Sequence, residues 1–131
     1  MNVVLDASGA TEILFKKENA GKFNKNFLEA SHVFAPDFFI PELSNTMWKY
    51  YKIKKLPENE CLDYIQKGID FIDEFIDVSF LWQEAFSEGV KNNHSIYDMF
   101  YLVTAKRNDA VLITCDSVLI EICKKNKIQV C

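Results

Sequence analysis

Apolar and polar positions along the chain form two kinds of pattern. Short runs of consecutive apolar residues, typical of strands buried in a parallel sheet, occur at residues 2–6, 32–36, 75–78 and 110–116, with an edge strand expected at 128–130. Between these runs, apolar residues recur every three or four positions, which is the spacing of a helix with one buried face. This spacing predicts helices at residues 7–17, 22–31, 41–56, 58–69, 80–93, 96–107 and 117–125.

Two residues help to set the predicted helix boundaries. Gly21 interrupts the periodic pattern between the first two helices, and Pro41 is well suited to be the first residue of the third. Strands that alternate with helices are typical of a parallel sheet covered on both faces. The predicted fold class is therefore α/β, a three-layer α/β/α sandwich with a mostly parallel central sheet.

Length and composition narrow the class of protein. The 131 residues fit one domain, 1–131, and a content of 49% apolar and 26% charged residues argues against disorder. No apolar run approaches the roughly 20 residues that span a bilayer, and no signal-type segment precedes the first strand. The four cysteines lack zinc-site spacing, so we expect reduced thiols in a cytoplasmic protein without membrane partners.

Four acidic residues stand where predicted helices begin: Asp6, Glu42, Asp98 and Asp116. Asp6 and Asp116 also end predicted strands. In an open parallel sheet, the carboxyl ends of the strands and the neighbouring helix starts form one rim, where ligands bind. If the four side chains meet there, they form an oxygen-rich pocket suited to Mg²⁺ or Mn²⁺.

The alternative is that each acid separately caps a helix. Asp is a favoured N-cap, first-turn acids suit the helix dipole, and Ser95 with Asp98 fits the capping box. For one acid taken alone, capping is the better explanation.

Three features together favour a shared site. The hydroxyl residues Ser8, Ser95 and Thr114 accompany three of the acids and can hydrogen-bond to carboxylates as supporting residues.

The second feature is that Asp98 opens a helix that is apolar on most sides, where a charged group needs a partner. The third is that no lysine or arginine lies next to any of the four acids. Clustered acids with bound divalent cations suit phosphodiester hydrolysis. The net charge of −4 excludes a broadly basic nucleic-acid binder, but bound cations would reverse the potential at the site.

Four segments in this order resemble the PIN-domain ribonucleases, most closely the VapC-type toxins of toxin–antitoxin pairs: residues 3–8, 41–45, 95–105 and 109–116. The resemblance covers nearly the whole chain. It implies that the four acids surround one or two Mg²⁺ or Mn²⁺ ions, with Asp6 and Asp98 as the most direct ligands. It also implies that Ser95 and Thr114 are polar support residues.

The same resemblance implies endonucleolytic RNA cleavage, often of tRNA or ribosomal RNA. Toxin members commonly form homodimers and are silenced by a cognate antitoxin whose C-terminal segment wraps the toxin. Many toxins carry a basic residue after the last Asp and an aromatic residue three positions beyond it, where this chain has Ser117 and Leu119. This departure concerns substrate contacts more than the metal site.

Other readings of the sequence remain open. Residues 49–55 interleave lysines with aromatic residues, either as an RNA-binding surface or, slightly favoured, as a solvated helix end. His94 either touches substrate or is an exposed loop histidine. Surplus phenylalanines after Lys22 and Glu58 could serve a dimer or antitoxin groove.

The alternative functions are a stand-alone RNA-processing PIN nuclease and a catalytically silent PIN-fold interaction module. A phosphoacceptor receiver domain ranks lower, because Leu5 stands where such domains carry a second acid. An aspartyl-phosphate phosphatase ranks lower too, because Ser8 stands where the Asp-x-Asp motif needs its second aspartate.

Overall fold

Four parallel strands form the central sheet, in the order β3–β2–β1–β4. The structure, a computed structural model, describes residues 1–131. The strands are β1 (Asn2–Leu5), β2 (His32–Pro36), β3 (Glu74–Ile76) and β4 (Ala110–Ile113). Val3 pairs with Val33 on one side and Val111 on the other, and all three are buried. Burial on both faces explains why the central strands are continuously apolar.

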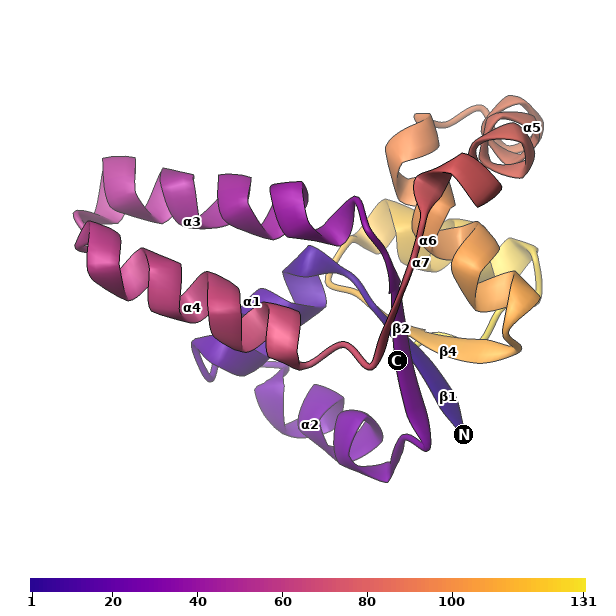
Figure 1. Cartoon of the computed structure of the whole chain (residues 1–131). Coiled ribbons are helices and arrows are strands. Elements are labelled where there is room, and N and C mark those ends of the chain that lie inside the picture. Colours follow the sequence, from indigo (N-terminus) through magenta and orange to yellow (C-terminus); the bar gives the residue numbers. More distant parts are fainter.

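Seven α-helices cover the sheet in two groups. They are α1 (Ala7–Leu14), α2 (Ala20–Glu29), α3 (Phe39–Lys54), α4 (Glu58–Asp70), α5 (Trp82–Asn92), α6 (Ile96–Arg107) and α7 (Ser117–Lys125). Figure 1 shows α1 to α4 on one side of the sheet and α5 to α7 on the other. Right-handed crossovers produce this division, because the chain runs β1 to β2 to β3 in one direction and returns to β4 in the other. The predicted three-layer α/β/α fold is confirmed.

The first two helices begin and end at other residues than predicted. α1 stops at Leu14 rather than at residue 17, because the chain turns at Lys16, whose φ is 53°. α2 starts at Ala20, so Gly21 lies inside the helix instead of breaking it. A side chain on Gly21 would meet nothing within 4 Å, so only its flexibility weakens the helix there.

Two further boundaries differ. α3 begins at Phe39, so Pro41 lies within its first turn rather than at its first position. Pro is tolerated there because the N–H groups of the first turn have no partner inside the helix. The helix predicted from residue 80 begins at Trp82, because the 3₁₀ turn η1 (Val78–Phe80) comes first and is capped by Asp77.

The predicted edge strand at 128–130 is wrong. Only a single bridge forms, between Leu112 and Val130. Leu112 donates its N–H to the Gln129 carbonyl (2.9 Å) and accepts one from Cys131 (3.0 Å). The segment therefore touches the edge of β4 at one residue and does not form a ladder.

Helix α6 forms the centre of the core. Every residue from Met99 to Ala105 is buried, as the apolar sequence of this helix predicts. The phenylalanines after Lys22 belong to the core and do not line an exposed groove, since Phe23 is buried and Phe27 packs on Phe71 with ring centroids 5.1 Å apart. No helix is both long enough and apolar enough to cross a membrane.

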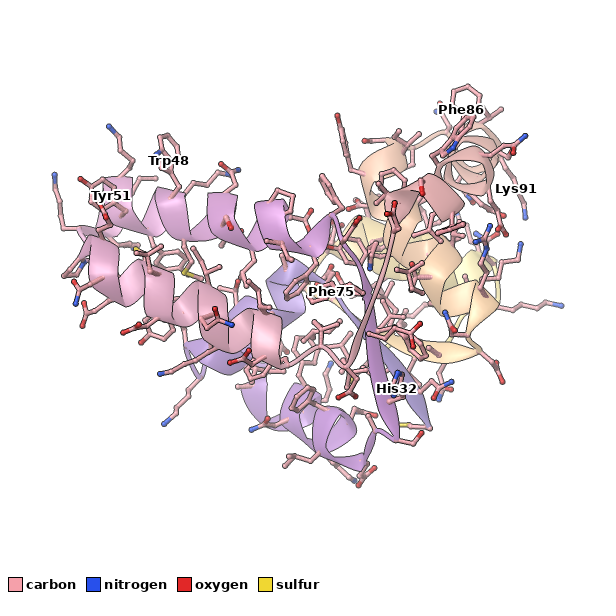
Figure 2. All side chains as sticks on the ribbon, in the orientation of Figure 1. His32, Trp48, Tyr51, Phe75, Phe86 and Lys91 are labelled. Atoms are coloured by element: carbon pink, nitrogen blue, oxygen red, sulfur yellow. The ribbon has the colours of Figure 1, made fainter.

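Exposed aromatic residues gather elsewhere, on α3 and α5. Figure 2 shows Trp48 and Tyr51 pointing outward from α3 and Phe86 pointing outward from α5. Leu62, on α4 after Glu58, is exposed as well and lines a groove with Trp48 and Tyr51.

Candidate functional site

The candidate site lies where the strand order reverses. The chain leaves β1 towards β2 and β3, and returns on the other side of β1 as β4. In open α/β sheets, ligands bind in the crevice at the carboxyl ends of the strands at such a point. Asp6 directly follows β1, and its N–H donates to the carbonyl of Ile113, the last residue of β4 (3.2 Å).

Gly9 lets α1 come close to β4. A Cβ atom at position 9 would lie 2.7 Å from the Ile113 carbonyl oxygen and about as close to two side chains. Only glycine fits without a shift of the backbone. This close approach brings Ser8, at the start of α1, next to Thr114, just after β4.

Asp6 is buried and bonded through both carboxylate oxygens. Its Oδ1 accepts hydrogen bonds from Ser8 Oγ (2.7 Å) and from the Gly9 N–H (2.8 Å), and its Oδ2 accepts one from the Thr114 hydroxyl. Burial raises its pKa from 3.8 to about 7; the three hydrogen bonds oppose that shift, and the charge of Glu42 adds to it. Asp6 therefore holds its negative charge at a cost that a bound cation would remove.

Ser8 and Thr114 link the two strand ends. Ser8 Oγ accepts the N–H of Cys115 (2.9 Å), and Thr114 Oγ1 accepts the N–H of Asp116 (3.1 Å). Each hydroxyl donates to Asp6 and accepts a backbone N–H from the segment after β4. The two hydroxyl residues thus fix the orientation of the Asp6 carboxylate.

Glu42 lies in the first turn of α3 and is bonded to a residue that the sequence reasoning missed. Its Oε1 accepts a hydrogen bond of 2.6 Å from the hydroxyl of Tyr101, which is buried in α6. Burial raises the pKa of Glu42, the bond from Tyr101 lowers it, and the charges of Asp98 and Asp116 raise it. The spacing offered a signal, since Tyr101 follows Asp98 by three positions and so shares its helix face.

Asp98, in the first turn of α6, has His94 as its neighbour. His94 Nε2 lies 3.6 Å from Asp98 Oδ2, and both side chains are partly buried, so His94 is a loop histidine that faces a site acid rather than only solvent. Burial raises the pKa of Asp98, the charge of Asp116 raises it further, and His94 lowers it. Ser95 caps α6 by accepting the Tyr97 N–H (3.5 Å) and makes no hydrogen bond to Asp98.

Asp116 is an N-cap and also belongs to the group of acids. Its Oδ1 accepts the N–H groups of Val118 (2.9 Å) and Leu119 (3.0 Å) at the start of α7. Its charge nevertheless raises the pKa values of Glu42 and Asp98. Capping and convergence are therefore compatible, because one carboxylate oxygen serves the helix and the other is free.

All four acids line one cleft of about 500 Å³. No lysine or arginine forms an ion pair with any of them. Three of the four carboxyl groups have raised pKa values, to which burial contributes most and the charge of a neighbouring acid contributes as well. The site thus concentrates negative charge that no direct ion pair with a lysine or arginine neutralises.

The donor set fits a hard divalent cation held partly by water. As the side chains stand, no three acidic, histidine or cysteine residues lie close enough together to grip one ion. Mg²⁺ usually binds through one or two carboxylates and keeps several waters, so a tight protein cage is not required. Carboxylates from four separate segments around one cleft satisfy that chemistry.

Comparison with known proteins agrees with this geometry. The PIN domain family model matches residues 3–125. Ribonuclease VapC3 of Pyrobaculum aerophilum is 24% identical over 123 residues, which cover 92% of this chain and 94% of that protein.

Two solved structures share the fold. PAE2754 from Pyrobaculum aerophilum superposes with a TM-score of 0.74 at 18% identity, over 93% of this chain and 87% of that one. The complex VapBC2 from Rickettsia felis, bound to a DNA fragment from its promoter, contains a chain with a TM-score of 0.67 at 15% identity, over 99% of this chain and 97% of that one.

Proposed function

This chain belongs to the PIN domain family, and on that premise we propose that it is a Mg²⁺- or Mn²⁺-dependent endoribonuclease, the toxin of a type II toxin–antitoxin system. Residues 1–131 act as one nuclease domain in the cytoplasm. The observation that carries the proposal is the meeting of Asp6, Glu42, Asp98 and Asp116 in one cleft, where none of them forms an ion pair with a lysine or arginine.

The four acids are proposed as the metal ligands and catalytic residues. When bound, one or two cations supply positive charge for the scissile phosphate and acidify water. The protein's own contribution is orientation. Ser8, Gly9 and Thr114 fix Asp6, and Tyr101 fixes Glu42. A carboxylate held by such outer partners loses less entropy when it binds an ion.

Cleavage of RNA tests this proposal. The purified chain, freed of any bound partner, should cut a panel of tRNA and ribosomal RNA substrates with Mg²⁺ or Mn²⁺ and stop when EDTA is added. Asp98→Asn should lower the rate by about 100-fold or more, the scale of losing an electrostatic group at a reacting centre. Cleavage that persists in EDTA, or an Asp98→Asn variant with full activity, would refute the metal mechanism.

We further propose an antitoxin partner and a homodimer. The support is the VapBC2 neighbour together with two exposed apolar surfaces. One is the α3–α4 groove of about 260 Å³, lined by Met47, Trp48, Tyr51, Cys61, Leu62 and Ile65. The other is the α5 stripe, formed by Trp82, Phe86 and Val90 at successive intervals of four residues.

Their shapes suggest different partners. A concave groove accepts an inserted segment, as when an amphipathic helix lies in an apolar groove, and so suits the antitoxin. A convex helical stripe suits a second copy packed around a two-fold axis. A chain that cleaves RNA but stays monomeric and binds no antitoxin would instead be a stand-alone RNA-processing nuclease.

A further inference from the structure

The acidic cleft also contains two cations. Of the 15 lysine and arginine residues, only Lys17 and Lys49 line it, beside the four site acids and Glu12. Neither lysine forms an ion pair with an acid. Both are exposed, so their charges remain available to a ligand in the cleft.

A fixed turn brings Lys17 to this position. The chain leaves α1 through Lys16, whose φ is 53°, and the Lys17 N–H then donates to the Glu12 carbonyl (3.0 Å). The Glu12 side chain accepts the N–H of Asn19 (3.0 Å), which closes the turn. Lys17 thus faces α3 although it is far from that helix in sequence.

Tyr50 holds the Lys17 side chain in place. Lys17 Nζ donates to the Tyr50 hydroxyl (2.5 Å) and lies 5.2 Å from the centroid of its ring. The ring itself stacks on Phe15, with centroids 4.7 Å apart and planes inclined by 15°. Since the Tyr50 hydroxyl accepts from Lys17, its own proton is free to donate to a further acceptor.

One face of α3 connects these groups to the acids. Glu42, Asn45, Thr46, Lys49 and Tyr50 follow one another at alternating intervals of three residues and one, and all line the cleft. At 1.5 Å rise per residue, Lys49 lies roughly 10 Å along the helix from Glu42. This separation favours contact with a phosphate next to the one at the acids over contact with that same phosphate.

We propose that Lys17, Lys49 and Tyr50 form a subsite for single-stranded RNA, in which the two ammonium groups and the Tyr50 hydroxyl hold the phosphate of a nucleotide adjacent to the scissile bond. This inference rests on the proposed function and adds to it the path of the substrate, which runs along α3 from Glu42 to Tyr50.

The size of the cleft favours one strand over a duplex. About 500 Å³ lies within the range of pockets that hold one small-molecule ligand, roughly 300–1,000 Å³. Such a space takes one or two nucleotides of a single strand. Double-stranded RNA is instead recognised across its broad minor groove, over many base pairs.

Binding to a labelled single-stranded RNA oligonucleotide tests the subsite. Fluorescence anisotropy with Mg²⁺ present is measured in an Asp98→Asn background, so that cleavage does not intervene. Adding Lys17→Met or Lys49→Met should weaken binding on the order of tenfold, the scale of one charge-assisted phosphate contact. Each loss should also flatten the slope of log K against log salt by about 0.7. Lys17→Arg should retain most of the affinity.

Matched controls lie on the same helix. Lys52 and Lys54 are exposed lysines of α3 that do not line the cleft, so Lys52→Met and Lys54→Met should leave affinity and slope unchanged. Equal effects at all four lysines, no effect at Lys17 and Lys49, or the absence of RNA binding would overturn the subsite. A duplex of the same sequence that binds more tightly would overturn its assignment to a single strand.

The outcomes separate the two proposals. Cleavage by the unmodified protein with binding that does not depend on Lys17 or Lys49 refutes the subsite and leaves the nuclease. Lysine-dependent RNA binding without any metal-dependent cleavage refutes the nuclease and leaves Lys17, Lys49 and Tyr50 as an RNA-binding site only.

Discussion

At the scale of a single residue, Asp6 shows how the site buries a carboxylate whose charged form is disfavoured. The carboxylate is buried, accepts three hydrogen bonds and lies near the negative Glu42. The hydrogen bonds lower its pKa, but burial raises it more, to about 7. Near neutral pH the folded protein therefore either keeps a proton on Asp6 or tolerates a poorly solvated charge.

The raised pKa predicts how stability depends on pH without metal. Below about pH 4, Asp6 is protonated in both the folded and the unfolded chain, and its full contribution to stability is present. As pH rises towards 7, the unfolded chain releases this proton while the folded one retains it, so the free energy of unfolding falls. In EDTA, Tm should therefore be several degrees lower at about pH 8 than at about pH 5.5.

The matched variant isolates this effect. Asp6→Asn keeps the N-cap and removes the titrating group, so its Tm should change much less over the same pH interval. Glu42 and Asp98 also have raised pKa values, so the Tm of Asp6→Asn should still fall with rising pH, but by less than the Tm of the unmodified protein. A slope in Asp6→Asn equal to that of the unmodified protein would contradict the assignment.

Substitution of the acids by asparagine separates ligands from caps. In metal-free protein, Asp98→Asn removes one of several repelling charges, so stability should stay constant or rise by about 1 kcal/mol. The stabilisation that Mn²⁺ gives should shrink in Asp6→Asn and in Asp98→Asn, because a ligand stabilises in proportion to its affinity. Thermal shift with increasing Mn²⁺ measures both.

Asp77 provides the control for that experiment. It caps η1 by accepting the Ser79 N–H (2.8 Å) and lies outside the acidic cleft. Asp77→Asn should leave the Mn²⁺ shift intact. A full Mn²⁺ shift in both Asp6→Asn and Asp98→Asn would mean that the four acids are not a metal site.

At the scale of elements, α6 connects the core to the cleft. Its first turn carries Asp98, and its buried Tyr101 reaches Glu42 on α3 with a 2.6 Å hydrogen bond. One rigid helix therefore controls two of the four acids. The packing of α6 against the sheet fixes both carboxylates at once.

Tyr101→Phe tests this connection. The ring still fills the core, but Glu42 loses its donor, which should cost about 1 kcal/mol of unfolding free energy. Loss of an outer partner typically weakens metal binding or activity by about 10- to 100-fold. RNA cleavage rates and urea midpoints check the two effects. Unchanged cleavage would show that the hydrogen bond does not orient Glu42 for catalysis.

The approach of α1 to β4 gives a second prediction at this scale. Gly9→Ala would put a methyl group 2.7 Å from the Ile113 carbonyl oxygen and should cost about 1–3 kcal/mol. Gly21→Ala is the matched control, because nothing lies within 4 Å of its added methyl. In a helix, that change should stabilise by about 0.5–1 kcal/mol. Urea unfolding should show opposite signs for the two variants.

At the scale of the whole molecule, the exposed apolar surfaces are the feature that a monomer does not explain. The α3–α4 groove and the α5 stripe lie on helices at opposite ends of the molecule (Figure 1). Phe86 is 60% exposed and Leu62 58% exposed. Exposed apolar patches of this kind usually mark contacts with other proteins.

A charge placed in each surface tests the two partners separately. Phe86→Glu should convert a dimer into a monomer in size-exclusion chromatography with light scattering, while Leu62→Glu should leave the dimer intact. Leu62→Glu should abolish capture by the co-expressed antitoxin, and Phe86→Glu should not. Reversed results would exchange the two assignments, and a monomeric unmodified protein would refute the dimer.

The sequence by itself determined the layers of the fold and the position of the acids along the chain. The strands β1 and β4 are buried on both faces and hence continuously apolar, and α6 is recognisable because it is apolar on most sides. Both signals are local in sequence, as is the position of an acid at a helix start. The prediction of an edge strand at 128–130 is wrong, because the sequence pattern does not distinguish a bridge of one residue pair from a strand.

Only the tertiary structure decided which residues meet. Tyr101 and Glu42 are 59 positions apart, and Thr114 and Asp6 are 108 apart, so no local pattern pairs them. The sequence does not predict Lys17 as a cleft residue, because its position depends on the left-handed turn at Lys16, which brings its side chain to Tyr50. Burial and the charges of spatial neighbours raise the pKa values of three acids, and both exist only once the strand order brings these segments to one rim.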